Sequence, residues 1–278
     1  MEEERRQRHG VADNLQRFTH NGLRSKPLVR GLVPGYLLPV WHWIWSPLAT
    51  STLYYTLVRN RGGNFAGDLG RLFEAYLGRQ LRLMQVPVLG EIPYYEGKNH
   101  KLSVDFFVDF DDLTVLVECK SSRPDASVVM ANDDMFKHID TYIGKATKQI
   151  NGSFHRLSDL VPQLFESSKA QIGIIVTMEH YQDLILALQH QTAHPPVIPT
   201  VVLSISQIER LMTLDGEAVK EVLLRGARNA SPVHNGYFDI STTVDPLPFQ
   251  DNRILTEAFD TSILAKFAGD VGSADYER

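Results

Sequence analysis

Three residues near the middle of the chain have types and spacing that suit phosphate chemistry. Asp105 lies among apolar residues, and Glu118 and Lys120 follow it at the end of an apolar run, with twelve residues between the two acids. Two carboxylates held together repel each other unless a cation lies between them. Mg²⁺ is bound by one or two carboxylates plus waters and phosphates, and a nearby lysine can help deprotonate a water molecule. The pattern therefore predicts metal-dependent phosphodiester hydrolysis.

The strands around these residues must bring the two acids together. Side chains alternate across a strand, so Glu118 and Lys120 share one face while Cys119 points to the other. If a tight turn at residues 111–112 sets the pairing, Asp105 comes close to Glu118 on the same face. The alternative is a surface salt bridge that closes a sheet and has no chemical role.

A helix before these strands adds another acid. Apolar residues recur at three- and four-residue spacing over 68–84, which predicts an amphipathic helix. Glu74 lies on this helix, with Gly70 and Gly78 one turn away on either side. Small neighbours would let backbone or a ligand approach the carboxylate closely. The alternative is a solvated glutamate whose glycine neighbours are incidental.

The order of elements along the chain predicts the fold class. Strands are expected at 86–94, 102–110, 113–119, 171–177 and 201–204, and further helices at 133–156 and up to residue 191. This order favours an α/β domain with a mixed central sheet flanked by helices, not a regular βαβ array.

These features together resemble the PD-(D/E)XK nuclease superfamily. That superfamily includes type II restriction endonucleases, Mrr-like enzymes, Holliday-junction resolvases and many phage-defence nucleases. The resemblance covers residues 66–212, with Glu74 on a helix, Asp105 on a strand and Glu118-x-Lys120 on the next, in αβββαβ order. It implies a restriction-endonuclease-like core. Val104 stands before Asp105 where the family name has proline.

The resemblance also implies a role for each residue of the pattern. Asp105 and Glu118 would bind Mg²⁺, for which Mn²⁺ can substitute, and the main-chain carbonyl of Cys119 would be a further metal ligand. Lys120 would position or activate the attacking water. Glu74 would contribute through a second metal ion or a water, so we include it among the catalytic and metal-binding candidates.

The helix after the strands and the nearby basic residues complete the expected site. In this family that helix often supplies a glutamine or lysine, so Gln149 is the first catalytic candidate and Lys145 the second. Arg71 belongs to a basic stretch over 59–101. With Lys145 it is expected to contact DNA phosphates, which give affinity without sequence information. A solvated helix face explains the same arginines equally well.

Composition places the chain among soluble globular proteins. It has 278 residues, 43% hydrophobic and 22% charged, and one cysteine, which excludes a disulfide framework and any multi-thiolate metal site. With no secretory signal, we expect a cytoplasmic protein. The net charge of −5 is carried by residues 209–278, so it does not exclude a nucleic-acid site elsewhere. His190 and His194 have no third ligand at zinc spacing.

The segment 31–58 contains no charged residue and holds all three tryptophans of the chain. Prolines interrupt it, which disfavours a membrane span, and tryptophan-rich apolar surfaces are common at protein interfaces. We therefore expect a partner protein or a second copy to bind here. The chain divides into an aromatic arm (1–65), the core (66–212) and an irregular acidic extension (213–278) with a short helix near 255–267.

The sequence thus predicts a Mg²⁺-dependent DNA endonuclease that leaves 5′-phosphates and acts in phage defence or DNA processing. DNA is favoured over RNA by the resemblance alone. The alternative is a catalytically inactive nuclease-fold module for nucleic-acid binding or complex assembly, although such modules typically lose an acid or the lysine and this chain has all of them. A membrane-associated protein, supported only by the tryptophan-rich stretch, is the third hypothesis.

Overall fold

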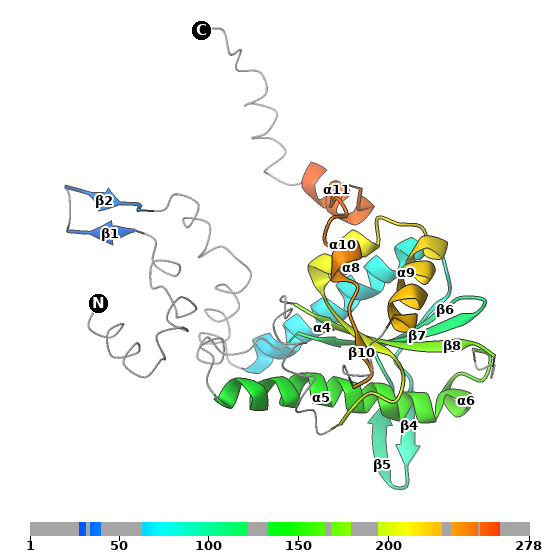
Figure 1. Cartoon of the computed structure of the whole chain (residues 1–278). Helices are drawn as coiled ribbons and strands as arrows, with labels where there is room; N and C mark the ends of the chain where they lie inside the picture. Colours follow the sequence, from blue (N-terminus) through cyan, green and yellow to red (C-terminus); the bar gives the residue numbers. More distant parts are fainter. Residues whose placement is uncertain are drawn as a thin grey trace. The chain divides into compact units, whose positions relative to one another are not determined.

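A computed structural model describes residues 28–31, 34–39, 63–121, 133–164, 168–178, 194–229, 235–249 and 251–261 (Figure 1). The tryptophans at 41, 43 and 45, the helix expected up to residue 191, and His190 lie outside these ranges. The chain forms two compact units: residues 1–72 with 121–142, and residues 73–120 with 143–278. The predicted boundaries at 65 and 212 therefore remain predictions.

The first unit contains a short antiparallel pair of strands, β1 (Val29–Arg30) and β2 (Tyr36–Leu37), in which Arg30 pairs with Tyr36. It also contains the first part of helix α4 (Gly63–Leu81) and of helix α5 (Asp133–His155). Most of the aromatic arm is outside the described residues. In the ranges that the structure describes, no helix is both long enough and apolar enough to cross a membrane.

The second unit is built on a six-stranded mixed sheet in the order β10-β9-β8-β7-β6-β3. The strands are β3 (Val88–Gly90), β6 (Phe106–Asp109), β7 (Leu113–Lys120), β8 (Ala170–Thr177), β9 (Thr200–Ser204) and β10 (Tyr237–Phe238). Strands β7, β8, β9 and β10 run parallel to one another, and β6 is antiparallel to both β3 and β7. The expected α/β class with a mixed, helix-flanked sheet is confirmed.

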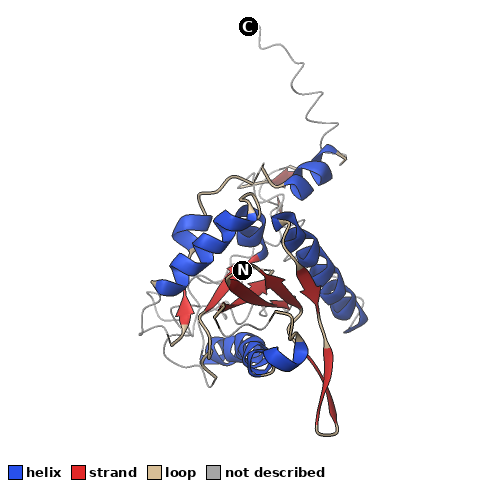
Figure 2. Ribbon diagram, turned by 90° about the vertical axis from the view of Figure 1, so that its right-hand side faces the viewer, coloured by secondary structure: helices blue, strands red, loops and turns tan. Residues whose placement is uncertain are grey.

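Helices cover both faces of this sheet (Figure 2). One face carries α5 from residue 143 onward and α6 (Leu157–Leu160); the other carries α4 from residue 73, η3 (Arg82–Met84), α8 (Ile205–Leu211) and α9 (Gly216–Arg228). Side chains alternate between the two faces along each strand, so the apolar strands provide apolar side chains to both layers of helices. Val115 and Val117 of β7 belong to the core cluster with Leu77 of α4, whereas the buried Leu116 between them faces the α5 side.

A hairpin interrupts the strands expected at 86–94 and 102–110. Strand β4 (Pro93–Glu96) pairs with β5 (Asn99–Leu102), and this pair projects from the sheet between β3 and β6 (Figure 2). Gly97 at its turn has φ +62°, a conformation that glycine adopts without strain. Glu96 pairs with Lys101 at 3.1 Å and with Arg156 at 3.0 Å. The hairpin therefore joins the end of β3 to the start of β6.

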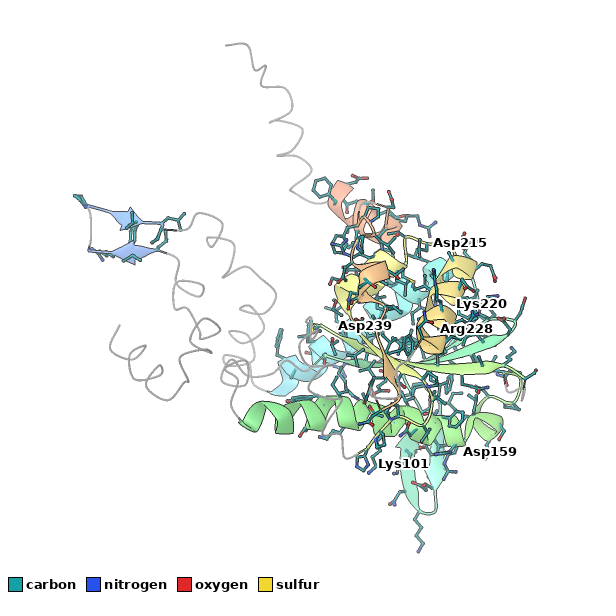
Figure 3. The ribbon with its side chains drawn as sticks, viewed as in Figure 1. Lys101, Asp159, Asp215, Lys220, Arg228 and Asp239 are labelled. Atoms are coloured by element: carbon teal, nitrogen blue, oxygen red, sulfur yellow. The ribbon has the colours of Figure 1, made fainter. Side chains whose placement is uncertain are left out.

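The turn between β6 and β7 is held by α9. Lys220 contacts Asp112 at 3.3 Å and Glu217 at 2.6 Å, and Asp215 caps the helix by accepting from the Ala218 N–H at 2.8 Å (Figure 3). Since this turn connects the strands that carry the candidate acids, the contact supports their pairing.

Residues after 213 are more regular than the sequence predicts. Helix α9 packs Val219 and Leu223 into the core, and β10 forms the edge of the sheet beside β9. Two short helices follow, α10 (Ser241–Val244) and α11 (Arg253–Asp260), the second near the helix expected at 255–267. Helix α9 is missed although Val219, Val222 and Leu223 recur at helical spacing, whereas β10 and α10 are too short to produce a visible periodicity.

Candidate active site

Strand register brings the two central acids together in the second unit. Phe106 of β6 pairs with Val117 of β7, so Asp105 and Glu118 stand opposite each other one residue beyond the pair. The Oδ2 atom of Asp105 accepts a hydrogen bond from the Cys119 N–H at 2.6 Å. The side chain of Asp105 is thus fixed against the end of β7.

Glu118 is buried with one carboxylate oxygen unsatisfied. Its side chain is 2% exposed, and Lys120 Nζ donates to its Oε1 atom. No described residue forms a hydrogen bond with Oε2. Burial first, and then the charge of Asp105, raises the pKa of Glu118 to about 8, while Lys120 opposes the rise. A buried carboxylate oxygen without a donor costs free energy unless a cation or a proton satisfies it.

Lys120 contributes the positive charge of this group. It lies two residues after Glu118 on the same strand, and its side chain is 22% exposed. Its ammonium group contacts only one of the two Glu118 oxygens described above. When both acids are ionised, two carboxylates face one lysine and the site carries excess negative charge.

The Cys119 side chain contacts both the core and an acid of the site. It packs against the core cluster that contains Leu77 and Phe73 of α4, and it interacts with the carboxylate of Asp105. Burial first, and then the charge of Asp105, raises the pKa of the thiol far above its ordinary value. A thiol that stays protonated is a poor nucleophile. The predicted role of Cys119, metal binding through its main-chain carbonyl, does not require an ionised thiol.

Glu74 lies near Asp105 from the side of α4. It is half-buried, and burial followed by the charge of Asp105 raises its pKa. The flanking glycine at 78 serves packing: a Cβ there would lie 2.9 Å from the Phe106 ring. At Gly70 a Cβ would meet only Ser121 Oγ, at 3.4 Å. Gly78 therefore gives room to a side chain of β6, and ligand access to Glu74 past these glycines remains a prediction.

Gln149 and Ser153 of α5 hold the backbone that leads into Asp105. The Gln149 side-chain amide donates to the Ser103 carbonyl at 2.7 Å, and Ser153 Oγ accepts from the Val104 N–H at 2.9 Å. The structure therefore brings Gln149 to the site through the residues that precede Asp105, and its direct role in catalysis remains a prediction.

The two predicted phosphate contacts lie at the surface. Arg71 is 80% exposed and pairs with Asp68 of the same helix. Lys145 is exposed on α5. Exposure is compatible with binding a polyanion, and phosphate binding by either residue remains a prediction.

Glu91 is a neighbour of the site that the sequence analysis does not identify. It follows β3, where Gly90 pairs with Phe106, so it lies just beyond the end of the ladder and near Asp105. Burial, then the charges of Asp105 and Glu74, raise its pKa, and Lys120 lowers it. A signal exists in the sequence, since Glu91 is the one acid in the apolar run 86–94.

These residues fit a hard divalent cation. The described residues contain no group of three or more His, Cys, Asp and Glu side chains that could hold a metal. Mg²⁺ does not require one, because it binds through one or two carboxylates and keeps several waters. The buried Oε2 atom of Glu118, next to Asp105, is the acceptor that such an ion would satisfy.

Comparisons with known proteins leave the family open. No family model matches this sequence, and no curated protein matches it. A search of solved structures finds the small subunit of the heterodimeric restriction endonuclease R.BspD6I, which is 11% identical. The alignment covers 70% of this chain and 94% of that subunit, with a TM-score of 0.36. This weak similarity does not establish a shared fold, so the function must be argued from the site.

Proposed function

We propose that this protein is a Mg²⁺-dependent nuclease that hydrolyses phosphodiester bonds in DNA. One observation carries the proposal. A buried glutamate, Glu118, has an unsatisfied oxygen beside a second carboxylate and a lysine at the end of a sheet. Charged groups at such a position are costly unless a ligand compensates them. A divalent cation and a phosphate together would provide that compensation.

Asp105 and Glu118 are the residues that would hold the cation, Mg²⁺ or Mn²⁺, with the Cys119 carbonyl as a further ligand. When bound, such a cation neutralises charge on phosphate oxygens and lowers the pKa of a water molecule. The hydrogen bond from the Cys119 N–H keeps Asp105 Oδ2 oriented toward β7. The backbone register therefore holds the two acids in place, and they need little rearrangement to bind a cation.

Lys120 supplies the positive charge on the phosphate side. Its ammonium group is part-exposed while Glu118 is buried, so it can donate hydrogen bonds to a phosphate oxygen or to the attacking water. Positioned donors of this kind stabilise the charge that develops on the phosphate during hydrolysis. Gln149 supports the site by fixing Ser103, and we assign Glu74 a supporting role through water or a second cation.

Duplex DNA is the proposed substrate on the basis of the nuclease-superfamily resemblance. Arg71 and Lys145 are exposed and are proposed to contact its backbone, as are Lys98 and Lys101 of the β4–β5 hairpin. The proposal extends to products with 5′-phosphates, a cytoplasmic setting in phage defence or DNA processing, and a partner or second copy bound through segment 31–58.

Digestion of supercoiled plasmid, linear duplex and single-stranded DNA, with Mg²⁺, Mn²⁺ or EDTA, tests this proposal. The wild type should cut only with a metal ion, and Asp105→Ala and Lys120→Ala should not cut. Asp111→Ala is the matched control, because Asp111 is exposed at the far end of the same strand pair. Cutting that survives both site substitutions would refute the site. DNA binding without cutting under any metal would favour the inactive-module hypothesis.

A further inference from the structure

Three acidic residues, the acidic row, lie next to one another at the ends of three neighbouring strands. Gly90, Phe106 and Val117 pair side by side in β3, β6 and β7. The next residue outward along each chain segment is acidic: Glu91, Asp105 and Glu118. Glu91 and Asp105 lie just beyond the ends of β3 and β6. The order of the strands therefore places Glu91 near Asp105 on the side away from Glu118, and the charge of Asp105 acts on Glu91.

The backbone around Glu91 is held in this position. The Ile92 N–H donates to Ser103 Oγ at 2.8 Å, and the Ser103 N–H donates to the Ile92 carbonyl at 3.0 Å. These bonds follow the register of the β4–β5 hairpin, in which Pro93 pairs with Leu102, and this register is shifted by one residue from the pairing of Gly90 with Phe106. The side-chain amide of Gln149 donates a hydrogen bond to the main-chain carbonyl of the same Ser103. Glu91 is thus an ordered part of the site and not a residue of a free loop.

Charged groups of the site interact electrostatically with Glu91. Burial raises the pKa of its carboxyl group, the charges of Asp105 and Glu74 raise it further, and Lys120 lowers it. When Glu118 is ionised as well, the site holds four negative charges and the one positive charge of Lys120. Carboxylates at this spacing repel one another, and a divalent cation would relieve the repulsion.

The buried Oε2 atom of Glu118 gives an independent reason to expect a ligand in this row. It has no hydrogen-bond partner among the described residues, and the side chain is only 2% exposed. An acidic row alone could be a solvated surface. A row that ends in an unsatisfied, buried carboxylate oxygen points to a cation.

We propose that Glu91 is a further carboxylate of the cation site, which attracts the hydrated divalent ion without binding it directly. The proposal rests on the proposed function. An indirect role follows because the described residues contain no group of three acids close enough to ligate one metal, and Glu91 is exposed. Mg²⁺ keeps several of its waters in proteins, so a nearby carboxylate can act on the hydrated ion. Glu91 is therefore a positioning residue.

Calorimetric titration of Mn²⁺ into the full chain, without DNA, tests this assignment. Glu91→Gln should weaken binding by about threefold to tenfold in about 50 mM KCl, and the loss should shrink in about 500 mM KCl, because salt screens charges that do not touch. The stoichiometry should not change. Glu91→Asp keeps the charge and should restore most of the affinity.

Two further variants serve as the positive and the negative control. Glu118→Gln should abolish binding at both salt concentrations. Glu221→Gln should leave binding unchanged, because Glu221 is 59% exposed on α9 and its contact with Arg228 spans 3.6 Å. Far-UV circular dichroism checks that each variant is folded.

The outcomes separate this inference from the function on which it rests. Unchanged affinity in Glu91→Gln, with Mn²⁺ bound by the wild type, would overturn the role of Glu91 alone. Complete, salt-independent loss in Glu91→Gln would mean a direct ligand and would also overturn it. Absence of Mn²⁺ binding by the wild type would overturn both the cation site and the role of Glu91.

Discussion

Replacement of Glu118 by glutamine tests the buried carboxylate without any assumption about the substrate. Glu118 is 2% exposed, and burial with the charge of Asp105 raises its pKa from the usual 4.5 to about 8. In the unfolded chain the group titrates at its usual pKa. The stability that depends on protonated Glu118 is therefore fully present below about pH 4.5 and is lost as the pH rises through about 8.

The gap between the two pKa values sets the size of this loss. At about 1.4 kcal/mol for each pKa unit, the wild type should lose up to about 5 kcal/mol between the two pH values. Glutamine has the same shape and no charge, so Glu118→Gln does not incur this loss. The variant should be more stable than the wild type at about pH 8 by several kcal/mol, and nearly equal to it at about pH 5.

Urea unfolding in EDTA at both pH values measures the difference, with Glu221→Gln as the control because that residue is exposed on α9. Addition of Mg²⁺ at the higher pH should stabilise the wild type and not Glu118→Gln, because a ligand that binds only the folded state raises the free energy of unfolding. A stability difference that is the same at both pH values would show that Glu118 does not change protonation on folding. The account of the site would then be wrong.

Four other substitutions, one of them a control, test the packing that positions the site. Gly78→Ala should lower the free energy of unfolding by about 1–3 kcal/mol, measured by thermal unfolding, because its Cβ would meet the Phe106 ring at 2.9 Å. The control Gly67→Ala, with open space around it, should raise that free energy by about 0.5–1 kcal/mol. Equal effects of the two substitutions would contradict this packing. Asn252→Ala should cost about 2–4 kcal/mol in urea unfolding, since the buried Asn252 bonds Gln80 and caps α11; a neutral result would refute its anchoring role. Gln149→Ala should slow DNA cleavage about tenfold or more, with a loss of about 1 kcal/mol in stability, by freeing Ser103; full activity would remove Gln149 from the site.

The central acids could be predicted from the sequence because strand geometry is local. The two-residue alternation of β7 is sufficient to separate Glu118 and Lys120 from Cys119, and the turn at 111–112 is sufficient to place Asp105 opposite Glu118. Periodicity likewise locates α4, α5 and the apolar strands. These features depend on spacing within a few residues.

Glu91 could not be predicted in the same way, because its place depends on where one strand ends. The run 86–94 looks continuous, but Gly90 is the last residue of β3 and Pro93 begins the hairpin. Only the register with β6 brings Glu91 beside Asp105. The role of Gly78 depends in the same way on Phe106, a partner far away in the sequence.

The most direct test of the central claim is the rate at which supercoiled plasmid is nicked in Mg²⁺ by the wild type, Lys120→Ala and Asp111→Ala. Lys120 contacts Glu118 and carries the charge assigned to the phosphate, whereas Asp111 lies at the exposed turn. The account predicts that Lys120→Ala cuts about 100-fold more slowly or not at all, that Asp111→Ala cuts at the wild-type rate, and that EDTA stops all cutting. Cleavage by Lys120→Ala at the wild-type rate, or cleavage that persists in EDTA, would contradict it.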